Sequence, residues 1–402
     1  MTRFLNHDDL PFHALIEPAQ DAIRAAVGSS PSPFALIVHD WCMFHFGQHA
    51  SKGDRYRRSH DTDLGYELGS ALVVSAADGR PLGAMEFRLR TAEGMLSTRP
   101  GGAALPPGHV DEIADVMATA SGWGLGRQPV HVIDREADSV GHYRRWHAAG
   151  HRFVIRADHE RTVLHEGRAS KLAEVVASLE GRFAAVRDAV GRPEVVTTRT
   201  GTGVVQTAEA AVVLHRPAVH HTGEKTPAGH KKKRHEPGVP LPLRLIVTRI
   251  VDPAGVTLAE WWLLSNLAST AADSATIGRW YSRRWNIESY HKLLKSGGMN
   301  AESWQQESGG AFLRRLCVAS QACLTVWHLQ RTEGEEASRL RMALVRLSGR
   351  LMKHKVESTA PALLEGLGRL LAIDDLMQSE DLSEILALAR RLMPRLFPDR
   401  SG

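Results

Sequence analysis

Cysteine is rare in this sequence of 402 residues, which contains three. Cys42, Cys317 and Cys323 are odd in number, and no two of them form a CxxC pair. Small secreted domains are held together by several paired cysteines, and thiolate zinc sites use closely spaced ones. The sequence therefore predicts neither a disulfide framework nor a cysteine zinc site.

Long apolar runs are also missing. No run approaches the roughly 18 residues that a membrane-spanning helix needs. The first residues lack the basic-then-apolar order of a secretion signal. We therefore expect a cytoplasmic protein, and the length predicts two or three domains.

Neither sign of charge dominates, because 50 Lys and Arg face 45 Asp and Glu and leave a net charge of +5. This mild excess suits a polyanionic partner without requiring one. The cations gather at three places: Arg55, Arg57 and Arg58; Lys231–Arg234; and Arg279, Arg283, Arg284, Lys292 and Lys295. The run Lys231–Arg234 lies in residues 216–240, whose Pro, Gly, His and Lys content predicts an exposed loop. There it would either contact a DNA backbone or face solvent.

Apolar patterning predicts a mixed sheet flanked by helices. Short apolar or alternating runs indicate strands, and amphipathic periodicity indicates helices. The strands are expected at residues 34–38, 65–76, 83–91, 129–133 and 152–156, and the helices at 110–121 and 139–149. This order is what an RNase H-like core with a mixed five-stranded sheet would give.

The rest of the chain differs in character. Residues 161–258 alternate like strands and predict a mostly β insertion, and residues 261–265 predict a further strand. One long helix is expected from about 272 to 296, ended by Gly297 and Gly298. We expect the following domains: 1–33, a short helical segment and linker; 34–160 and 259–330, two parts of an RNase H-like core; 161–258, the β-rich insertion; and 331–402, a helical region.

Three carboxylates stand out as candidates for metal chemistry. Asp40 and Asp134 each follow an apolar strand, where a sheet presents functional groups at its edge, and Glu288 lies in the long helix. Phosphodiester cleavage requires an activated nucleophile and a stabilised leaving oxygen, and two metal ions about 4 Å apart provide both. Hard ions such as Mg²⁺ or Mn²⁺ prefer oxygen ligands, so carboxylates from separate elements are suitable.

The predicted long helix carries Glu288 among cations. Tyr281, Arg284, Glu288 and Lys295 follow one another at spacings of 3, 4 and 7, which places them on one helix face, with Trp285 and Lys292 at its edges. Arginine can bind phosphate oxygens through two parallel hydrogen bonds, so this face suits a phosphate beside a metal. The alternative is an exposed face with ordinary ion pairs such as Arg284–Glu288.

The same residues resemble the IS4 family of bacterial insertion-sequence transposases, which belongs to the DDE superfamily. Tyr281, Arg284, Glu288 and Lys295 match its Y-(2)-R-(3)-E-(6)-K signature without a gap, and residues 134–138 read DREAD, as around its second catalytic aspartate. The resemblance covers roughly residues 34–330. It implies a DNA transposase that nicks, forms and opens a hairpin, and transfers strands. It also implies Mg²⁺ (or Mn²⁺) as cofactor, transposon ends and target DNA as partners, a homodimer as the active form, and association with the nucleoid when DNA is bound.

The resemblance also implies a role for each matching residue. Asp40, Asp134 and Glu288 would be the catalytic metal ligands. Residues that would bind DNA are Tyr281, Arg284, Lys292 and Lys295 at the phosphates, Trp285 and one of Trp261 or Trp262 stacked on a flipped base, and Arg156 near the DNA end. For the two adjacent tryptophans and for Arg156, a purely structural role is an equal alternative.

Two departures from the family pattern leave alternatives open. The family often has Asp-Thr-Thr at its first aspartate, whereas this sequence has Asp40-Trp41-Cys42. Only 39 residues precede Asp40, fewer than an end-recognition domain usually takes. A truncated, inactive or inhibitory DNA-binding remnant is therefore one alternative, and an RNase H-like nuclease that cuts without joining is another.

Overall fold

The computed structural model describes residues 2–7, 9–58, 60, 62–106, 108–225, 231–353, 356–379 and 382–393. The chain divides into two compact units. One contains Met1–Ser289 and Gln305–Cys317, and the other contains Tyr290–Trp304 and Val318–Gly402. Helix α8, Gly309–Arg331, begins in the first unit and continues in the second.

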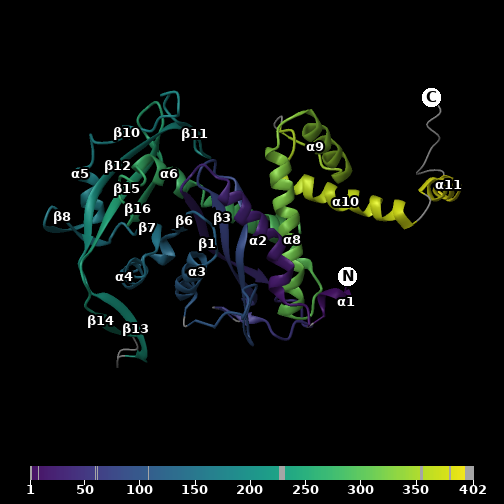
Figure 1. Ribbon diagram of the computed structural model, residues 1–402, viewed down its shortest axis with the longest axis horizontal. Coiled ribbons are helices and arrows are strands. Elements are labelled where there is room, and N and C mark those ends of the chain that lie inside the picture. The colour runs from purple at the N-terminus through teal and green to yellow at the C-terminus, as the bar shows by residue number, and fades with distance from the viewer. Residues whose placement is uncertain are drawn as a thin grey trace. The chain divides into compact units, whose positions relative to one another are not determined.

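The first unit is built on a large mixed sheet (Figure 1), in which five strands follow the order β4-β3-β1-β6-β7. Strands β1, β6 and β7 are parallel, while β3 and β4 are antiparallel to their neighbours. Their bounds are β1 Phe34–His45, β3 Leu64–Ser75, β4 Pro81–Thr91, β6 Gln128–Ile133 and β7 Arg152–Arg156. The predicted mixed α/β sheet is confirmed, and its strand order is compatible with an RNase H-like fold.

Both faces of this sheet are covered by helices. Leu36 and Val38 of β1 pack into an apolar cluster with α6, Ser274–Ser282. Ala35 and Ile37 face the opposite way, into a cluster with α2, Phe12–Gly28, and α3, Glu112–Ser121. Side chains alternate between faces along a strand, so the row of Leu36 and Val38 continues to Asp40.

The sheet extends beyond β7 through antiparallel strands of residues 161–258. Strand β16 pairs with β7, and β15, β12, β8 and β9 follow in that order, with β10 and β11 at the far edge of β12. The bounds are β8 Thr162–His165, β9 Arg168–Lys171, β10 Ala184–Ala185, β11 Val195–Thr197, β12 Thr202–Leu214, β15 Leu241–Val251 and β16 Thr257–Ser265. These residues are mostly β, with the helix α5, Leu172–Ser178, between β9 and β10.

The described residues of 216–240 do not form the predicted loop, and residues 226–230 of that prediction lie outside the described residues. Ala218–Lys225 and Lys231–Glu236 pair as an antiparallel hairpin, β13–β14, which is a separate two-stranded sheet. The prediction from composition was wrong because hairpin pairing depends on backbone hydrogen bonds, which a polar sequence can also make. The part of the Lys231–Arg234 run whose side chains are described, Lys232 to Arg234, is exposed.

The predicted helix over residues 272–296 is interrupted. Asp273 caps α6 by accepting a hydrogen bond from the backbone N–H of Thr276 at 2.7 Å, and α6 ends at Ser282. A second helix, α7, spans Trp285–Lys292 and continues as a π-helical turn, Leu293–Gly297. At the interruption the backbone N–H groups of Arg284 and Ile287 bond to carbonyl oxygens three residues earlier, at 2.9 and 3.0 Å, and the Arg283 side chain there donates to the carbonyl oxygens of Ser75 and Ala76 at 3.1 and 2.6 Å.

The remaining elements are helical in the second unit and short in the first. In the second unit, α9 packs against α10. The elements of the second unit are α9 Glu335–Ser348, α10 Ala360–Ser379, α11 Leu382–Leu392 and a 3₁₀ turn at Ala301–Ser303.

The remaining elements of the first unit are short. They are α1 Thr2–Leu5, β2 Tyr56–Arg57, β5 Gly94–Ser97, α4 Val140–Ala148, and 3₁₀ turns at His109–Asp111 and Arg135–Ala137. None of the helices in the described residues is both long and apolar enough to span a bilayer.

Candidate active site

Asp40 lies inside strand β1 and not at its end as predicted. The parallel pairing of β1 with β6 stops at Val38, but β1 continues to His45 along β3. One carboxylate oxygen of Asp40 accepts the backbone N–H of Trp41 at 2.9 Å, and the other lies 3.4 Å from a terminal nitrogen of Arg284. Asp40 therefore follows the point where β1 and β6 separate, with its carboxylate held on both sides.

Asp134 directly follows β6, as the sequence predicts. Its carboxylate caps the 3₁₀ turn Arg135–Ala137 by accepting the backbone N–H of Glu136 at 2.9 Å. Because β1 and β6 are parallel neighbours, the residues beyond their paired segments emerge at the same edge of the sheet.

Glu288 is joined to this edge through Arg284. Both residues lie on the α6–α7 segment, and the Arg284 guanidinium donates to the Glu288 carboxylate while its other terminal nitrogen faces Asp40. The Arg284 side chain is 11% exposed, against 35% for Glu288. One buried cation thus connects a carboxylate from the sheet with one from the helix.

The pKa of Asp40 shows that all three carboxylates share one electrostatic environment. The pKa of the Asp40 carboxyl is raised to about 6, chiefly by burial and in smaller part by the negative charges of Asp134 and Glu288. Arg284 and the Trp41 N–H oppose this rise. For Arg284, burial lowers the pKa, but the nearby Tyr281, Asp40, Glu288 and Asp134 outweigh burial and raise it.

Tyr281 and Arg156 complete this region. Tyr281 is buried, and burial raises the pKa of its hydroxyl, an effect that Arg284 and Arg156 oppose and Asp134 reinforces. Arg156, the last residue of β7, lines a pocket of about 540 Å³ together with Asp134, Arg135, Glu136 and Arg284. The structure therefore brings together Asp40, Asp134, Arg156, Tyr281, Arg284 and Glu288.

The tryptophans occupy very different environments. Trp285 is 53% exposed, and the Arg284 guanidinium lies 6.0 Å from its ring centroid. Trp262 is buried in the core, where it stacks on His159 with ring centroids 3.9 Å apart. Trp261 is half-buried on the opposite face of β16. Trp262 is thus a core residue, Trp261 is partly accessible and Trp285 is exposed.

Lys292 and Lys295 belong to the second unit. Lys292 is the last residue of α7, and Lys295 lies in the π-helical turn, where its amine is 3.3 Å from a carboxylate oxygen of Glu302. Lys295 is therefore engaged in an ion pair within its own unit.

A network of buried charges behind Asp40 was missed at the sequence level. Trp41 donates its indole N–H to Glu112 of α3 at 3.2 Å, and Arg90 of β4 donates to the other Glu112 oxygen at 2.8 Å. Glu67 lies 3.5 Å from Arg90, and all three charged residues are at most 10% exposed. A signal was present in the sequence, since β3 and β4 are otherwise apolar strands and contain charged residues at internal positions.

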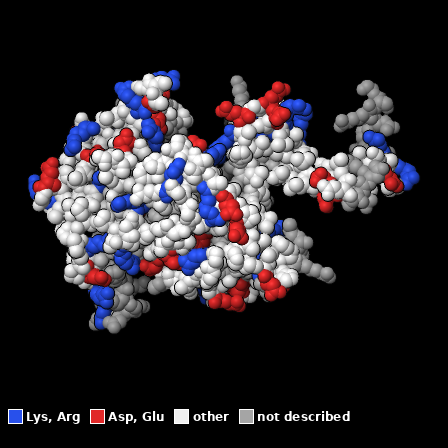
Figure 2. Space-filling view, in the orientation of Figure 1, with Lys and Arg blue, Asp and Glu red and all other residues white. Residues whose placement is uncertain are grey.

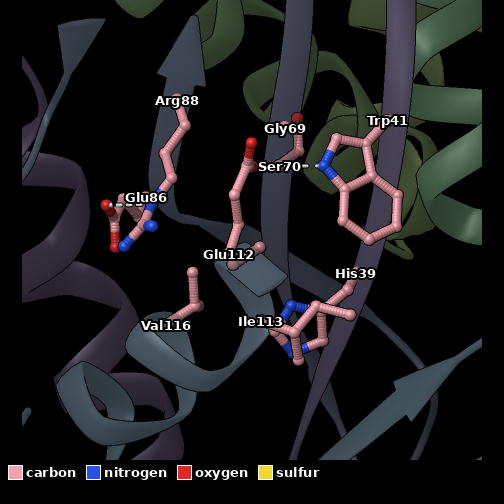
Figure 3. A pocket seen from close by; sticks show the side chains of 10 residues that line it. His39, Trp41, Gly69, Ser70, Glu86, Arg88, Glu112, Ile113 and Val116 are labelled. Carbon is pink, nitrogen blue, oxygen red and sulfur yellow. Dashed lines mark hydrogen bonds and ion pairs between the residues drawn. The ribbon is translucent and has the colours of Figure 1, made fainter. Parts of the chain in front are cut away.

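Two residues of this network, Trp41 and Glu112, line a small cavity (Figure 3). His39, Glu86 and Arg88 border this cavity of about 20 Å³, room for one water molecule. Arg88 pairs with Glu86 at 2.7 Å, and His39 Nε2 is 2.9 Å from Nδ1 of His131. Burial lowers the pKa of His39 to about 3, with a further contribution from Arg88, so His39 is neutral.

The site suits a cation without being a preformed metal cage. Asp40, Asp134 and Glu288 contribute three negative charges in the same region as Arg284 and Arg156. In the part of the chain that the structure describes, no group of three or more His, Cys, Asp or Glu side chains is arranged to hold a metal ion. The guanidinium of Arg284 lies between two of the carboxylates and supplies positive charge there.

Comparisons with known proteins place few constraints on this site. No protein-family model matches the sequence, and no curated protein does. Among solved structures, the chain is similar to piggyBac transposase in a synaptic complex with hairpin DNA, with a TM-score of 0.27 and 9% sequence identity. The similarity covers 80% of this chain and 59% of the piggyBac transposase chain, so this chain spans less than two thirds of the length of that transposase. A likeness this weak supports no functional argument.

Proposed function

We propose that this protein is a DDE-type DNA transposase that resembles the IS4 family. The observation that carries the proposal is the convergence of Asp40 from β1, Asp134 from the end of β6 and Glu288 from α7 around Arg284. In this proposal residues 34–160 and 259–330 form the RNase H-like catalytic core, and residues 161–258 are its insertion. The enzyme would act as a homodimer that bridges two DNA ends.

Asp40, Asp134 and Glu288 are the residues that would hold the metal. Carboxylate oxygens are the ligands that Mg²⁺ and Mn²⁺ prefer. When bound, two such ions would activate the attacking water or 3′ hydroxyl and stabilise charge on the leaving oxygen. The fit rests on charge, because the four carboxylates of this region, Asp40, Asp134, Glu136 and Glu288, exceed its three arginines, Arg135, Arg156 and Arg284, by one negative charge.

The remaining side chains of the site suit a DNA end. Arg156 and Arg284 line the pocket and would bind phosphate oxygens, to which arginine can donate two parallel hydrogen bonds. The Tyr281 hydroxyl would donate to the same backbone. Trp285, exposed beside Arg284, offers a surface on which an unpaired base can stack. Lys292 and Lys295 would add phosphate contacts.

A second candidate, a DNA-binding protein without catalysis, is favoured by a specific observation. Arg284 pairs with both Asp40 and Glu288, so its positive charge already partly neutralises the carboxylates that a metal would need. A protein that keeps this pairing permanently would still bind DNA but would not cut it.

A cleavage assay on intact and pre-nicked duplex DNA with Mg²⁺, Mn²⁺ or EDTA separates the candidates. The transposase requires metal-dependent cleavage and joined products, both lost in Asp134→Ala. Cleavage without joining would instead indicate a nuclease. DNA binding without cleavage, unchanged by Asp134→Ala, would indicate the non-catalytic protein.

A further inference from the structure

The described side chains of the hairpin β13–β14 are exposed beyond its root. Its strands pair only with each other, from Ala218↔Glu236 to Lys225↔Lys231, in a sheet separate from the main one. Ala218 is buried at the root, but the next residue, Val219, is already 47% exposed. An isolated two-stranded ribbon is only marginally stable in water, so the ribbon suits a surface that gains order from a partner.

The root of the ribbon is fixed to the body of the first unit. Arg144 of α4 donates to the carbonyl oxygen of Arg216, before β13, at 3.1 Å, and to that of Val239, after β14, at 2.9 Å. Gly238 permits this approach, since a Cβ there would lie 2.6 Å from a terminal nitrogen of Arg144. The ribbon is thus anchored at both ends while its strands extend from the body (Figure 1).

The described side chains of β14 are strongly basic. Lys232, Lys233 and Arg234 are all exposed, and Figure 2 shows blue side chains gathered over this strand. Because side chains alternate along a strand, Lys233 faces one side of the ribbon and Lys232 and Arg234 face the other. Glu236 offsets part of this charge through its ion pair with Arg234 at 3.4 Å. Positive charge on both faces along an extended strand complements a linear polyanion better than a compact anionic site.

A surface path connects the ribbon root to the candidate active site. Arg135 lines the pocket of about 540 Å³ beside Asp134 and also a second pocket of about 690 Å³, which reaches Arg216 and Val219 at the ribbon root. In that second pocket Arg161 is neutralised by Asp138 at 2.8 Å. Neither Arg135 nor Arg216, both exposed, pairs with a carboxylate of the described residues.

We infer that the ribbon β13–β14 binds the phosphate backbone of duplex DNA whose end lies at Asp40, Asp134 and Glu288. The inference rests on the proposed function. It names a surface that would contact the duplex at some distance from its reacting end. Lys232 and Arg234 face the same side of the ribbon, two residues and roughly 7 Å apart, which is the length of about two base-pair steps, so both can meet phosphates of one duplex. Contacts of this kind position DNA without reading its sequence.

The test compares salt dependence of DNA binding for two triple variants of the full chain. Lys232→Ala, Lys233→Ala and Arg234→Ala together remove three ribbon cations. Arg168→Ala, Arg182→Ala and Arg199→Ala remove the same charge from exposed positions elsewhere in the first unit. The probe is a fluorescent duplex of about 30 base pairs and generic sequence, titrated at several salt concentrations. Each lost phosphate contact lowers the slope of log Kobs against log salt by about 0.9, so with Lys232 and Arg234 on the DNA side we expect the ribbon variant to lose about 2 units of slope and more than about tenfold in affinity.

The outcomes separate the inference from the proposed function. A ribbon-specific loss of slope, recovered in the charge-preserving variant Lys232→Arg/Lys233→Arg/Arg234→Lys, supports the inference. Equal slopes in the ribbon variant and the wild type, together with metal-dependent cleavage by both, overturn the inference and leave the proposed function intact. A wild type that neither binds nor cuts DNA overturns both. Ribbon-dependent binding to vesicles of anionic lipid, with DNA binding unchanged, also overturns the inference.

Discussion

Removing the charge of Arg284 should destabilise the first unit in a manner that depends on pH. The Arg284 guanidinium is 11% exposed and faces Asp40 and Glu288, with Asp134 close enough to raise its pKa. Arg284→Ala leaves these buried or half-buried carboxylates without their central cation. Removing one partner of a buried pair typically costs about 3–5 kcal/mol. For a unit of about 300 residues this corresponds to a fall in Tm of roughly 5–8 °C.

The pH dependence distinguishes a lost counter-ion from lost packing. Without Arg284 the pKa of Asp40 rises further above its present value of about 6, because burial and the two other carboxylates remain. A carboxyl whose pKa is raised by folding binds its proton more tightly in the folded state, so its ionisation weakens folding as the pH rises. The loss of stability caused by Arg284→Ala, measured as the fall in Tm, should therefore be largest near pH 7–8 and become smaller towards pH 4.

Thermal unfolding followed by circular dichroism between pH 4 and pH 8 measures this effect. Arg283→Ala is the matched control, since Arg283 donates to backbone carbonyl oxygens of Ser75 and Ala76, and its loss should be nearly independent of pH. Arg284→Lys should recover part of the lost Tm at neutral pH. Added Mg²⁺ should stabilise Arg284→Ala more than the wild type if the carboxylates accept a metal. If the fall in Tm of Arg284→Ala is the same at every pH, Arg284 does not act as the counter-ion of these carboxylates.

Three further predictions concern single residues. Glu288→Gln should abolish metal-dependent cleavage while DNA affinity, measured by fluorescence anisotropy, stays within a few-fold; retained cleavage would remove Glu288 from the site. His39, buried and neutral with a pKa of about 3, should make the protein lose stability as the pH falls from 6.5 towards 3, because the unfolded chain binds that proton first. The free energy of unfolding, measured with urea at several pH values, should fall less steeply between pH 6.5 and 3 in His39→Gln. An unchanged pH dependence would show that other groups cause the loss. Trp262→Ala, a truncation in the core, should lower the free energy of unfolding by about 3–5 kcal/mol. Trp285→Ala, at an exposed position, should leave Tm unchanged and weaken binding of single-stranded DNA. The opposite pattern would exchange the roles of the two tryptophans.

Patterning predicted the central strands well because each is apolar on both faces. The runs at residues 34–38 and 129–133 fall inside β1 and β6, and Asp134 lies directly after β6 as expected. The position of Asp40 was less well predicted. Strand β1 continues for several residues because β3 keeps pairing with it, and this pairing depends on a distant segment that local periodicity does not show.

The interrupted helix shows a similar limit. Residues 272–296 have helical periodicity, but α6 ends at Ser282 and α7 begins at Trp285, and between them the Arg283 side chain contacts backbone carbonyl oxygens at the end of β3, a distant segment that periodicity does not show. Spacing alone placed Tyr281, Arg284 and Glu288 on one face, and the structure still brings them together across the interruption. The hairpin β13–β14 was missed because its strands lack the apolar alternation that indicates a buried face.

The network behind Asp40 explains how a tryptophan can follow the first aspartate. The Trp41 indole donates to Glu112, and Gly69 on the neighbouring strand makes room, since a Cβ there would lie 3.2 Å from the indole nitrogen and 3.0 Å from a Glu112 oxygen. Glu112 is in turn held by Arg90 at 2.8 Å. The backbone N–H of Trp41 is also the donor to the Asp40 carboxylate, so the residue fixed by this network is the one that orients Asp40. A smaller residue at position 41 would lose the link to Glu112 and leave this buried carboxylate with one hydrogen-bond partner fewer, which is costly away from water. Gly69 and Glu112 therefore accommodate the Trp41 side chain locally, while the backbone N–H of Trp41 binds the Asp40 carboxylate.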